Sequence, residues 1–267
     1  EDPDRVLRGL RIDRSVRRTS TSVAGAAEAA RRLTDFLDNR LADYAELRNV
    51  PGLGAQSGLS PYLHFGQISP VEVALAVSAR IDSRNEESVR AFIEELVVRR
   101  ELGLNFVARN ERYDEYESLP AWARSTLEKH SLDDRPALYD RAALESAETH
   151  DPYWNAAMTE MQVTGSMAGY MRMYWGKRII EWSPTPLDAF RTALALNNKY
   201  FLDGRDPNAF ANVAWLFGKH DRPWGERPVF GTVRYMNDRG LERKFDMETY
   251  LRRVEAQRRA AEDPVPS

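Results

Sequence analysis

The stretch between Asp151 and Trp182 reads DPYWNAAMTEMQVTGSMAGYMRMYWGKRIIEW. It holds three of the six tryptophans and five of the seven methionines of the chain. Trp175 and Trp182 are separated by two helical turns, or about 10 Å along one helix face. We therefore expect helices over 154–163 and 168–182 that turn large side chains into a core. The same aromatic spacing would also suit stepwise electron transfer.

Helical periodicity continues on both sides of this segment. Further helices are expected over 136–148, 186–196 and 208–217. Apolar residues also follow the i, i+3, i+4 rhythm of a helix face between 26 and 47, at Leu33, Phe36, Leu37, Leu41 and Tyr44. The same rhythm marks a helix that continues toward Phe106, at Val89, Phe92, Ile93, Leu96 and Val97.

Two Ser-Pro pairs favour helix starts at 60–61 and 69–70, because serine can cap a helix and proline is tolerated in its first turn. No period-two alternation, no strand followed by a glycine-rich turn and no internal repeat is present. These patterns predict an all-α fold and argue against a parallel α/β sheet.

Several kinds of site are excluded by the sequence. The chain has no cysteine, and it lacks GxGxxG, GxxxxGK[ST], HExxH and GxSxG motifs. Its four histidines are scattered, so we expect no metal centre. No apolar run reaches the roughly 20 residues that span a bilayer, so we expect no membrane partner.

Charge is unevenly distributed although the net charge of the 267 residues is only −3. Residues 111–161 contain twelve acids and five bases, whereas 219–260 contain eleven bases and seven acids. A basic face of this kind suits a polyanion, although a mixed solvated surface explains it equally well. Candidate phosphate contacts are Lys219, Arg222, Arg227, Arg234, Arg239, Arg243 and Lys244.

Five segments together carry a resemblance to a known family. They read LSPYLHFGQIS (59–69), FIEELVVRREL (92–102), YMRMYWGKRIIEW (170–182), NNKYFLDGRDPN (197–208) and HDRPWGERPVFGTVRYMN (220–237). In this order and spacing the chain, from about residue 12 to 250, resembles the helical FAD-binding domain of class II cyclobutane pyrimidine dimer photolyases.

The resemblance implies an all-α catalytic domain without the family's N-terminal α/β antenna domain. We expect a connecting segment over 1–25, the FAD-binding and DNA-repair domain over 26–256 and a frayed tail over 257–267. The antenna domain would be missing or a separate chain, and its chromophore is left open. The resemblance also implies a monomer that acts in the cytoplasm, or in the nucleus of a eukaryote.

The family's flavin-binding positions map onto this chain in three places. The resemblance implies that Tyr44 and the turn of Ser57, Gly58, Leu59 and Ser60 lie at the FAD phosphates and ribityl chain. A helix start with small neighbours can offer backbone N–H groups to a pyrophosphate. Charged and amide contacts with the flavin ring are implied for Arg172, Asn197, Asp203, Gly204 and Arg205.

The implied substrate is DNA that contains a cyclobutane pyrimidine dimer, flipped out of the duplex. Glu95 matches the residue that binds the dimer's base edge, although an i, i+4 ion pair with Arg99 is an equally physical role. We also expect Arg99 to contact the substrate. Met173 and Trp215 match walls of the dimer pocket, and Arg222 matches an arginine near the site.

The implied reaction is light-driven electron transfer from FADH⁻ to the dimer, with return of the electron to the flavin after the ring opens. Trp182, Trp154 and Trp175 match a tryptophan chain that re-reduces oxidised flavin, with Trp182 expected nearest the flavin. Two other functions stay open: a cryptochrome-like FAD photoreceptor without repair activity, and a helical interaction module without catalysis.

Overall fold

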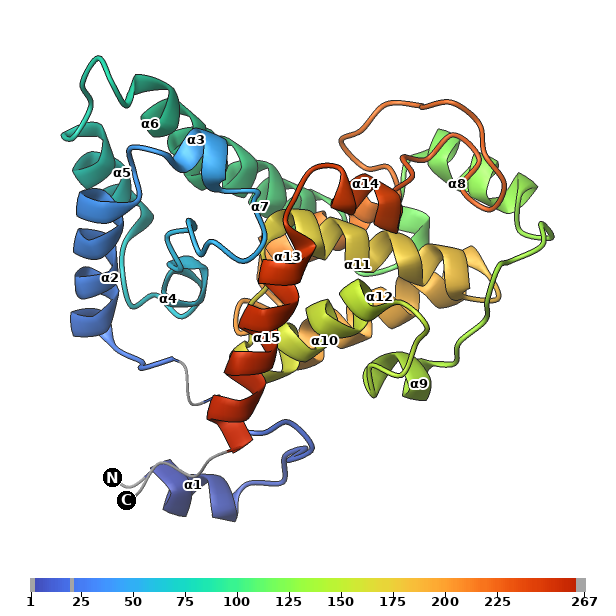
Figure 1. Cartoon of the computed structure of the whole chain (residues 1–267), viewed down its shortest axis with the longest axis horizontal. Helices are drawn as coiled ribbons and strands as arrows, with labels where there is room; N and C mark the ends of the chain where they lie inside the picture. The colour runs from blue at the N-terminus through green and yellow to red at the C-terminus, as the bar shows by residue number, and fades with distance from the viewer. Residues whose placement is uncertain (1–2, 20–21, 263–267) are drawn as a thin grey trace.

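The computed structural model of the chain describes residues 3–19 and 22–262. Within them the fold is helical (Figure 1), and the only β pairing is an isolated bridge between Arg227 and Gly231. This confirms the all-α prediction. In chain order the elements are α1 (Pro3–Gly9), α2 (Ala26–Asn39), α3 (Tyr44–Leu47), α4 (Ser60–His64), α5 (Pro70–Ser78), α6 (Glu86–Ile93), the π-helix η1 (Glu94–Arg99), α7 (Arg100–Arg109), the 3₁₀-helix η2 (Tyr116–Ser118), α8 (Ala121–Lys129), α9 (Arg141–Glu145), α10 (Pro152–Thr164), α11 (Gly169–Trp182), α12 (Pro186–Tyr200), α13 (Pro207–Leu216), α14 (Asp238–Glu242) and α15 (Met247–Glu262).

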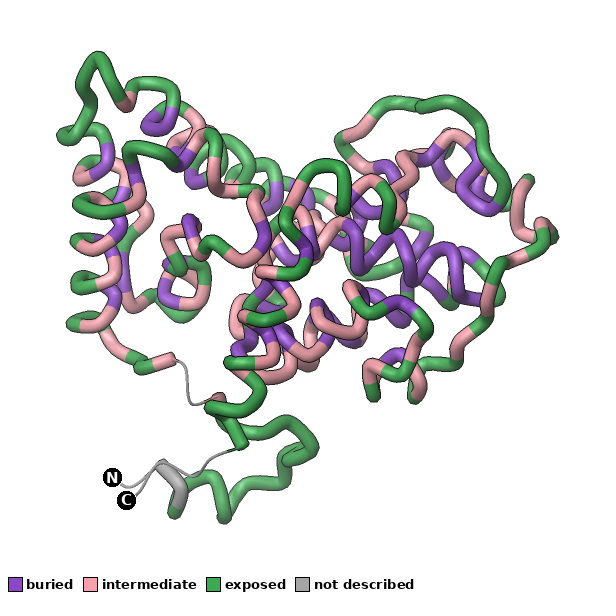
Figure 2. The backbone as a smooth tube through the Cα atoms, in the orientation of Figure 1, coloured by how far each residue is buried: buried purple, intermediate pink, exposed green. Residues whose placement is uncertain are grey.

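Two hydrophobic clusters divide the interior. The smaller one joins α2, α3, α4, α5 and α6, and the larger one is built around α10, α11, α12 and α13. In Figure 1 the first group lies at the left and the second at the centre and right, with α7 running between them. Buried backbone is most continuous along α11 in the second group (Figure 2), as its Trp- and Met-rich sequence predicts.

Local sequence explains the bounds of α10. Asp151 caps its start, because its Oδ1 accepts hydrogen bonds from the backbone N–H groups of Tyr153 (2.9 Å) and Trp154 (3.0 Å). Gly165 ends it with φ of +67°, a left-handed conformation that glycine adopts without penalty. A Cβ there would lie 2.5 Å from Leu202, so α10 and the turn after α12 meet closely at this point.

The helix that begins at Glu86 runs through to Arg109, as expected, but its middle is π-helical. In η1 the backbone hydrogen bonds run i→i+5, which inserts one residue into the turn and shifts the faces of the flanking helices. Glu95 and Arg99 both lie in this segment.

Three expected elements differ from the structure. The 26–47 helix is interrupted between α2 and α3, where the backbone N–H groups of Arg40 and Leu41 both close on the Phe36 carbonyl. Over 136–148 only α9 is helical, because Asp140 caps its start through the N–H of Ala143. Ser69 caps α5 as predicted, but Ser60 lies inside α4 and makes no cap.

The structure describes most of the expected connecting segment (1–25) and about half of the expected tail (257–267). Every side chain from 5 to 18 is exposed, and the first buried one is Ala29. α15 extends to Glu262, so 257–262 is helical rather than frayed, with Arg258 paired to Glu255 and to Glu262. Residues 1–2, 20–21 and 263–267 of these two segments lie outside the described residues, and the domain division stays a prediction.

No described helix is long and apolar enough to cross a membrane. Among the described residues, no three His, Cys, Asp or Glu side chains are grouped as metal ligands.

Candidate functional site

Arg172 and Asp203 form an ion pair between α11 and the turn after α12. Arg172 Nη2 donates to Asp203 Oδ1 at 3.2 Å, and the two side chains are only 16% and 21% exposed. The guanidinium carbon of Arg172 also lies 3.7 Å from the ring centroid of Phe201, a residue that the sequence reasoning missed. A guanidinium held by a carboxylate and a ring has a fixed plane.

The turn from Asn197 to Arg205 is tightly packed. Asn197 is 1% exposed, and its Nδ2 donates to Asn198 Oδ1 at 3.1 Å. Gly204 leaves no room for a side chain, since a Cβ would lie 2.9 Å from the Asn197 carbonyl. Arg205 has φ of +66° and donates from Nη1 to the Asn198 carbonyl at 2.6 Å. Arg205 is thus an exposed cap on α12, whereas Asn197 faces the interior.

The Ser57–Ser60 turn has one constrained position. Gly58 has φ of +69°, and a Cβ there would meet the Arg32 guanidinium at 3.2 Å. Leu59 is buried in the smaller cluster, while Gly58 and Ser60 are exposed. The turn therefore offers exposed backbone beside Arg32, a cation on α2 that the sequence reasoning did not assign.

Tyr44 lies in an aromatic group of the smaller cluster. Its ring packs edge-on against Phe36 (5.6 Å between centroids) and Phe92 (5.3 Å). Burial raises the pKa of its hydroxyl, against the opposing effect of the neighbouring Arg48. Tyr44 is thus a core residue whose position fixes α3 against α6.

Glu95, Arg99 and Trp215 line one small pocket between the η1–α7 helix and α13, with a cavity of about 40 Å³. The sequence had assigned all three to substrate binding, and the fold brings them together. Gly103 makes this possible, because a Cβ there would lie 2.8 Å from Asn208 Oδ1 and would push α7 and α13 apart.

The expected alternative for Glu95, an ion pair with Arg99, is wrong. Glu95 Oε1 accepts from Arg48 Nη1 at 2.7 Å, whereas Arg99 Nε lies 3.2 Å from Glu94 Oε1. The π-helical register of η1 removes the i, i+4 relation on which that alternative depended.

Three polar residues of the pocket were not predicted from the sequence: Asn208, Asn212 and His220. The two asparagines and Trp215 recur at i, i+4 and i+7 on α13, which was a readable signal. His220 comes from the loop after α13, and no sequence pattern marks it. Burial is the largest cause that lowers the pKa of His220, and the positive charges of Lys219 and Arg99 lower it further.

Met173 and Arg222 do not line this pocket. Met173 packs against the larger cluster. Arg222 is exposed, with its guanidinium carbon 5.3 Å from the ring centroid of Trp224, while Arg234 lies 4.4 Å from the same ring. These three side chains form a cationic and aromatic group on the loop after α13.

The three tryptophans of the opening segment are fully buried. The rings of Trp154 and Trp182 meet edge-on with centroids 5.7 Å apart. Trp154 Nε1 donates to the Trp175 carbonyl at 2.9 Å. Trp182 also packs against Tyr139 (5.4 Å) and His150 (5.2 Å), two residues that are not buried.

The three tryptophans lie at different distances from Arg172 along the chain, and the expected place of Trp182 next to the flavin stays a prediction. Trp175 follows Arg172 by three residues, or about 4.5 Å of helix axis, and Trp182 follows it by ten, or about 15 Å. Trp175 is therefore the tryptophan at the Arg172 end, and Trp182 lies at the far end beside His150.

A buried ionic network braces the same helices. Arg178 contacts Asp151 (3.2 Å), Glu181 (2.5 Å) and Asp238 (3.3 Å), and its Nε donates to the Tyr174 hydroxyl at 3.0 Å. Because Asp151 is also the cap of α10, the network fixes α10 against α11 and holds Trp154 in place.

Solved structures share this fold. The chain superposes on a bacterial class III photolyase from Agrobacterium tumefaciens with a TM-score of 0.66 and 23% identity, over 90% of this chain and 48% of that one. A Synechocystis cryptochrome gives 0.65 and 21% over the same shares. An archaeal photolyase from Sulfolobus tokodaii, solved with two FAD molecules, gives 0.63 and 17% over 99% and 55%. The chain is thus a helical domain of the photolyase/cryptochrome fold.

Several photo-lyases are more similar to this chain in sequence than these solved structures are. The chain is 52% identical over 230 residues to the deoxyribodipyrimidine photo-lyase of Methanothermobacter thermautotrophicus, covering 86% of this chain and 50% of the relative. That of Potorous tridactylus is 44% identical over 247 residues, covering 92% and 46%. The chain is thus a homologue of these photo-lyases over most of its own length. It spans about half the length of the relatives it matches, and no family model matches it.

The residues at Arg172 fit a polar ring such as a flavin. Arg172 Nε is buried and has no hydrogen-bond partner among the described residues, so this donor is free for an acceptor on a bound group. With Asn197 and Asp203 in the next helix and turn, it provides donors and acceptors of the kind a flavin ring requires.

Proposed function

We propose that this chain is the C-terminal catalytic half of a class II photolyase, which binds FAD and repairs cyclobutane pyrimidine dimers in DNA under light. The observation that carries the proposal is the Arg172–Asp203 pair, stacked on Phe201 with a buried donor left unused. Homology to deoxyribodipyrimidine photo-lyases supports the same function.

FAD, as FADH⁻, would supply the light absorption and the electron for repair. Arg172, Asn197 and Asp203 would hold the flavin ring. The Ser57–Ser60 turn would face the phosphates with the Arg32 guanidinium beside it. In this arrangement Tyr44 would support the FAD site from the smaller hydrophobic cluster, and Arg205 would support it as a cap on α12. Gly204 would let the backbone of its turn come close to the flavin.

Glu95, Arg99 and Trp215, whose shared pocket of about 40 Å³ is too small for a pyrimidine pair, would contact one edge of the flipped dimer. The Glu95 carboxylate can accept hydrogen bonds from a base edge, and the Trp215 ring offers a face for stacking. His220, with its lowered pKa, stays neutral at pH 7 and adds no further charge beside Arg99. Met173 and Arg222 would act outside this pocket, Met173 from the larger cluster and Arg222 on the DNA.

The buried tryptophans would carry electrons to oxidised flavin, with Trp154 between Trp175 and Trp182. The edge-on contact of Trp154 with Trp182 and its hydrogen bond to the Trp175 carbonyl support this middle place. We further propose a monomer that acts where the genome lies, in the cytoplasm or a nucleus.

The test is a repair assay on the purified chain, reconstituted with FAD and reduced. We expect it to remove thymine dimers from an oligonucleotide under blue light and not in the dark. If the chain binds flavin but removes no dimers in the light or in the dark, a cryptochrome-like photoreceptor would be favoured. A chain that binds no flavin would favour an interaction module.

A further inference from the structure

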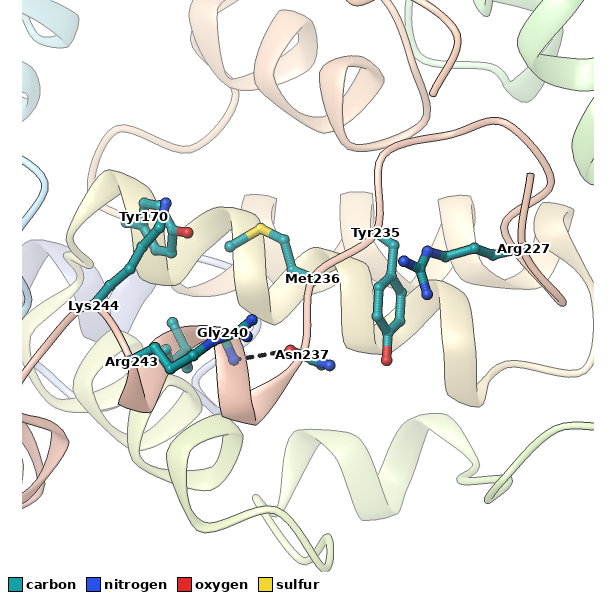
Figure 3. A pocket seen from close by; sticks show the side chains of 9 residues that line it. Tyr170, Arg227, Tyr235, Met236, Asn237, Gly240, Arg243 and Lys244 are labelled. Carbon is teal, nitrogen blue, oxygen red and sulfur yellow. Dashed lines mark hydrogen bonds between the residues drawn. The ribbon is translucent and has the colours of Figure 1, made fainter. Parts of the chain in front are cut away.

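A second, larger cavity lies on another part of the molecule (Figure 3). It has a volume of about 460 Å³ and is enclosed by the start of α11, the loop that precedes α14 and α14 itself. Its polar lining consists of Tyr170, Arg227, Tyr235, Asn237, Arg243 and Lys244. None of these residues lines the Glu95–Trp215 pocket.

The lining is cationic and unneutralised. Arg227, Arg243 and Lys244 have no carboxylate within ion-pair distance among the described residues, and no acid lines the cavity. Most arginines of the neighbouring α15 are paired, such as Arg252 with Glu248. A concave surface with three unpaired cations focuses positive potential and attracts an anion.

Aromatic rings stand beside these charges. Lys244 Nζ lies 5.0 Å from the ring centroid of Tyr170, and the guanidinium carbon of Arg227 lies 5.2 Å from that of Tyr235. Asn237 Oδ1 accepts from the Gly240 N–H at 2.9 Å, which leaves its Nδ2 group without a partner among the described residues. Figure 3 shows Tyr170, Lys244 and Arg243 on one side of the cavity and Tyr235 with Arg227 on the other.

We infer that this cavity binds a nucleotide, with its phosphate on Arg243 and Lys244 and its base or sugar against Tyr235, beside Arg227. Cations alone would serve a bare phosphate, whereas rings beside them offer stacking surface for a base. A volume of 460 Å³ exceeds the need of an inorganic anion and lies in the range of small-ligand sites.

The nucleotide can come from a DNA strand or from a free mononucleotide. Continuity favours the strand, because the loop that carries Arg227 and Tyr235 also carries the exposed Trp224 with Arg222 and Arg234. A strand that crosses this loop would reach the cavity without leaving the protein surface. The inference goes beyond the repair proposal and does not depend on bound flavin.

The test compares two double variants of equal charge change. R243Q/K244Q alters the cavity, and R141Q/R191Q removes two exposed arginines that line neither pocket. Binding of a labelled, undamaged single-stranded thymidine oligonucleotide is followed by anisotropy between 50 and 200 mM salt, roughly the range where phosphate contacts dominate. Titration with dTMP and with inorganic phosphate forms the second arm.

A strand site predicts at least about tenfold weaker oligonucleotide binding in the cavity variant and a salt slope smaller by about 1.4, the value for two lost phosphate contacts. The control should change less than about threefold. A free-nucleotide site predicts instead that dTMP binding is lost while oligonucleotide binding persists. Melting temperatures verify that both variants fold. If R243Q/K244Q does not fold, the single variant Lys244→Gln takes its place.

Equal behaviour of the two variants in both arms would overturn the inference. So would phosphate that competes as well as dTMP, since the rings would then contribute nothing. Dimer repair is not among the readouts, so failure of this inference and failure of the repair proposal are seen separately.

Discussion

Arg172 and Asp203 are joined by a 3.2 Å ion pair although they belong to different elements, α11 and the turn after α12. Both side chains are mostly buried, and the face of the Arg172 guanidinium is covered by Phe201. The pair therefore fixes one buried donor, Arg172 Nε, that no described residue uses. On our account this donor and its carboxylate partner serve the flavin.

Arg172→Lys should weaken FAD binding at least about tenfold, because lysine cannot stack on Phe201 and pair with Asp203 in one plane. Flavin retained after gel filtration, with the dissociation constant from fluorescence, measures the loss. Arg191→Lys, at an exposed position of α12, is the matched control. Equal flavin retention in the two variants would remove Arg172 from the cofactor site.

Glu95→Gln should lower the affinity for dimer-containing DNA by about ten- to a hundredfold, since a charged hydrogen bond contributes about 1.5–3 kcal/mol. FAD binding should stay unchanged. The lost ion pair with Arg48 is half-exposed, so unfolding free energy should fall by less than about 1 kcal/mol. Glu101→Gln, an exposed acid of α7 outside the pocket, should bind dimer DNA normally.

Trp154→Phe should slow photoreduction of oxidised flavin by at least about tenfold, because Trp154 links Trp175 to Trp182. Repair after chemical reduction of the flavin should persist, which separates electron supply from repair itself. The rate is read from flavin absorbance under blue light with an external reductant. Trp122→Phe, on α8, should photoreduce at the wild-type rate, and an equal loss there would point to a general packing defect.

Lys177 should make stability depend on alkaline pH. Its ammonium is fully buried and bonds to the Leu216 carbonyl, and burial lowers its pKa from 10.5 to about 7. Between these values only the unfolded chain takes up the proton, so folding stability should rise with pH. The effect is absent below about pH 7, where both states are protonated.

Lys177→Met tests this prediction, since methionine fills similar space without a charge. Melting temperatures of both proteins at pH 7, 8 and 9 should converge or cross, because only the wild type gains stability over that range. Parallel curves would show that Lys177 is protonated in the folded chain across the whole range.

The sequence predicts much of this fold because the informative patterns are local. Asp151 before Pro152 and Gly165 after α10 specify that helix through capping and a left-handed turn. The Trp- and Met-rich periodicity of 168–182 likewise specifies a buried α11. The break at Arg40 and Leu41 was missed because both backbone N–H groups share one carbonyl, a detail that apolar spacing does not encode.

The sequence grouped three residues of the candidate pocket, but it did not predict their contacts. Glu95, Arg99 and Trp215 converge as expected, yet Glu95 pairs with Arg48 because the π-helix alters the register. The contact of the Arg172 guanidinium with the Phe201 ring depends on how α11 packs against the turn after α12. Such tertiary contacts join distant parts of the chain and leave no periodic trace in the sequence.

The central claim is that these helices hold a reduced flavin in electron-transfer contact with a dimer seated at Glu95 and Trp215. The most direct measurement is the excited-state lifetime of FADH⁻ bound to the purified chain, with dimer-containing DNA and with the same DNA undamaged. We predict that the dimer shortens the lifetime, that undamaged DNA does not, and that Glu95→Gln reduces the difference. Equal lifetimes with both DNAs, under conditions where dimer DNA is shown to be bound, would contradict the account.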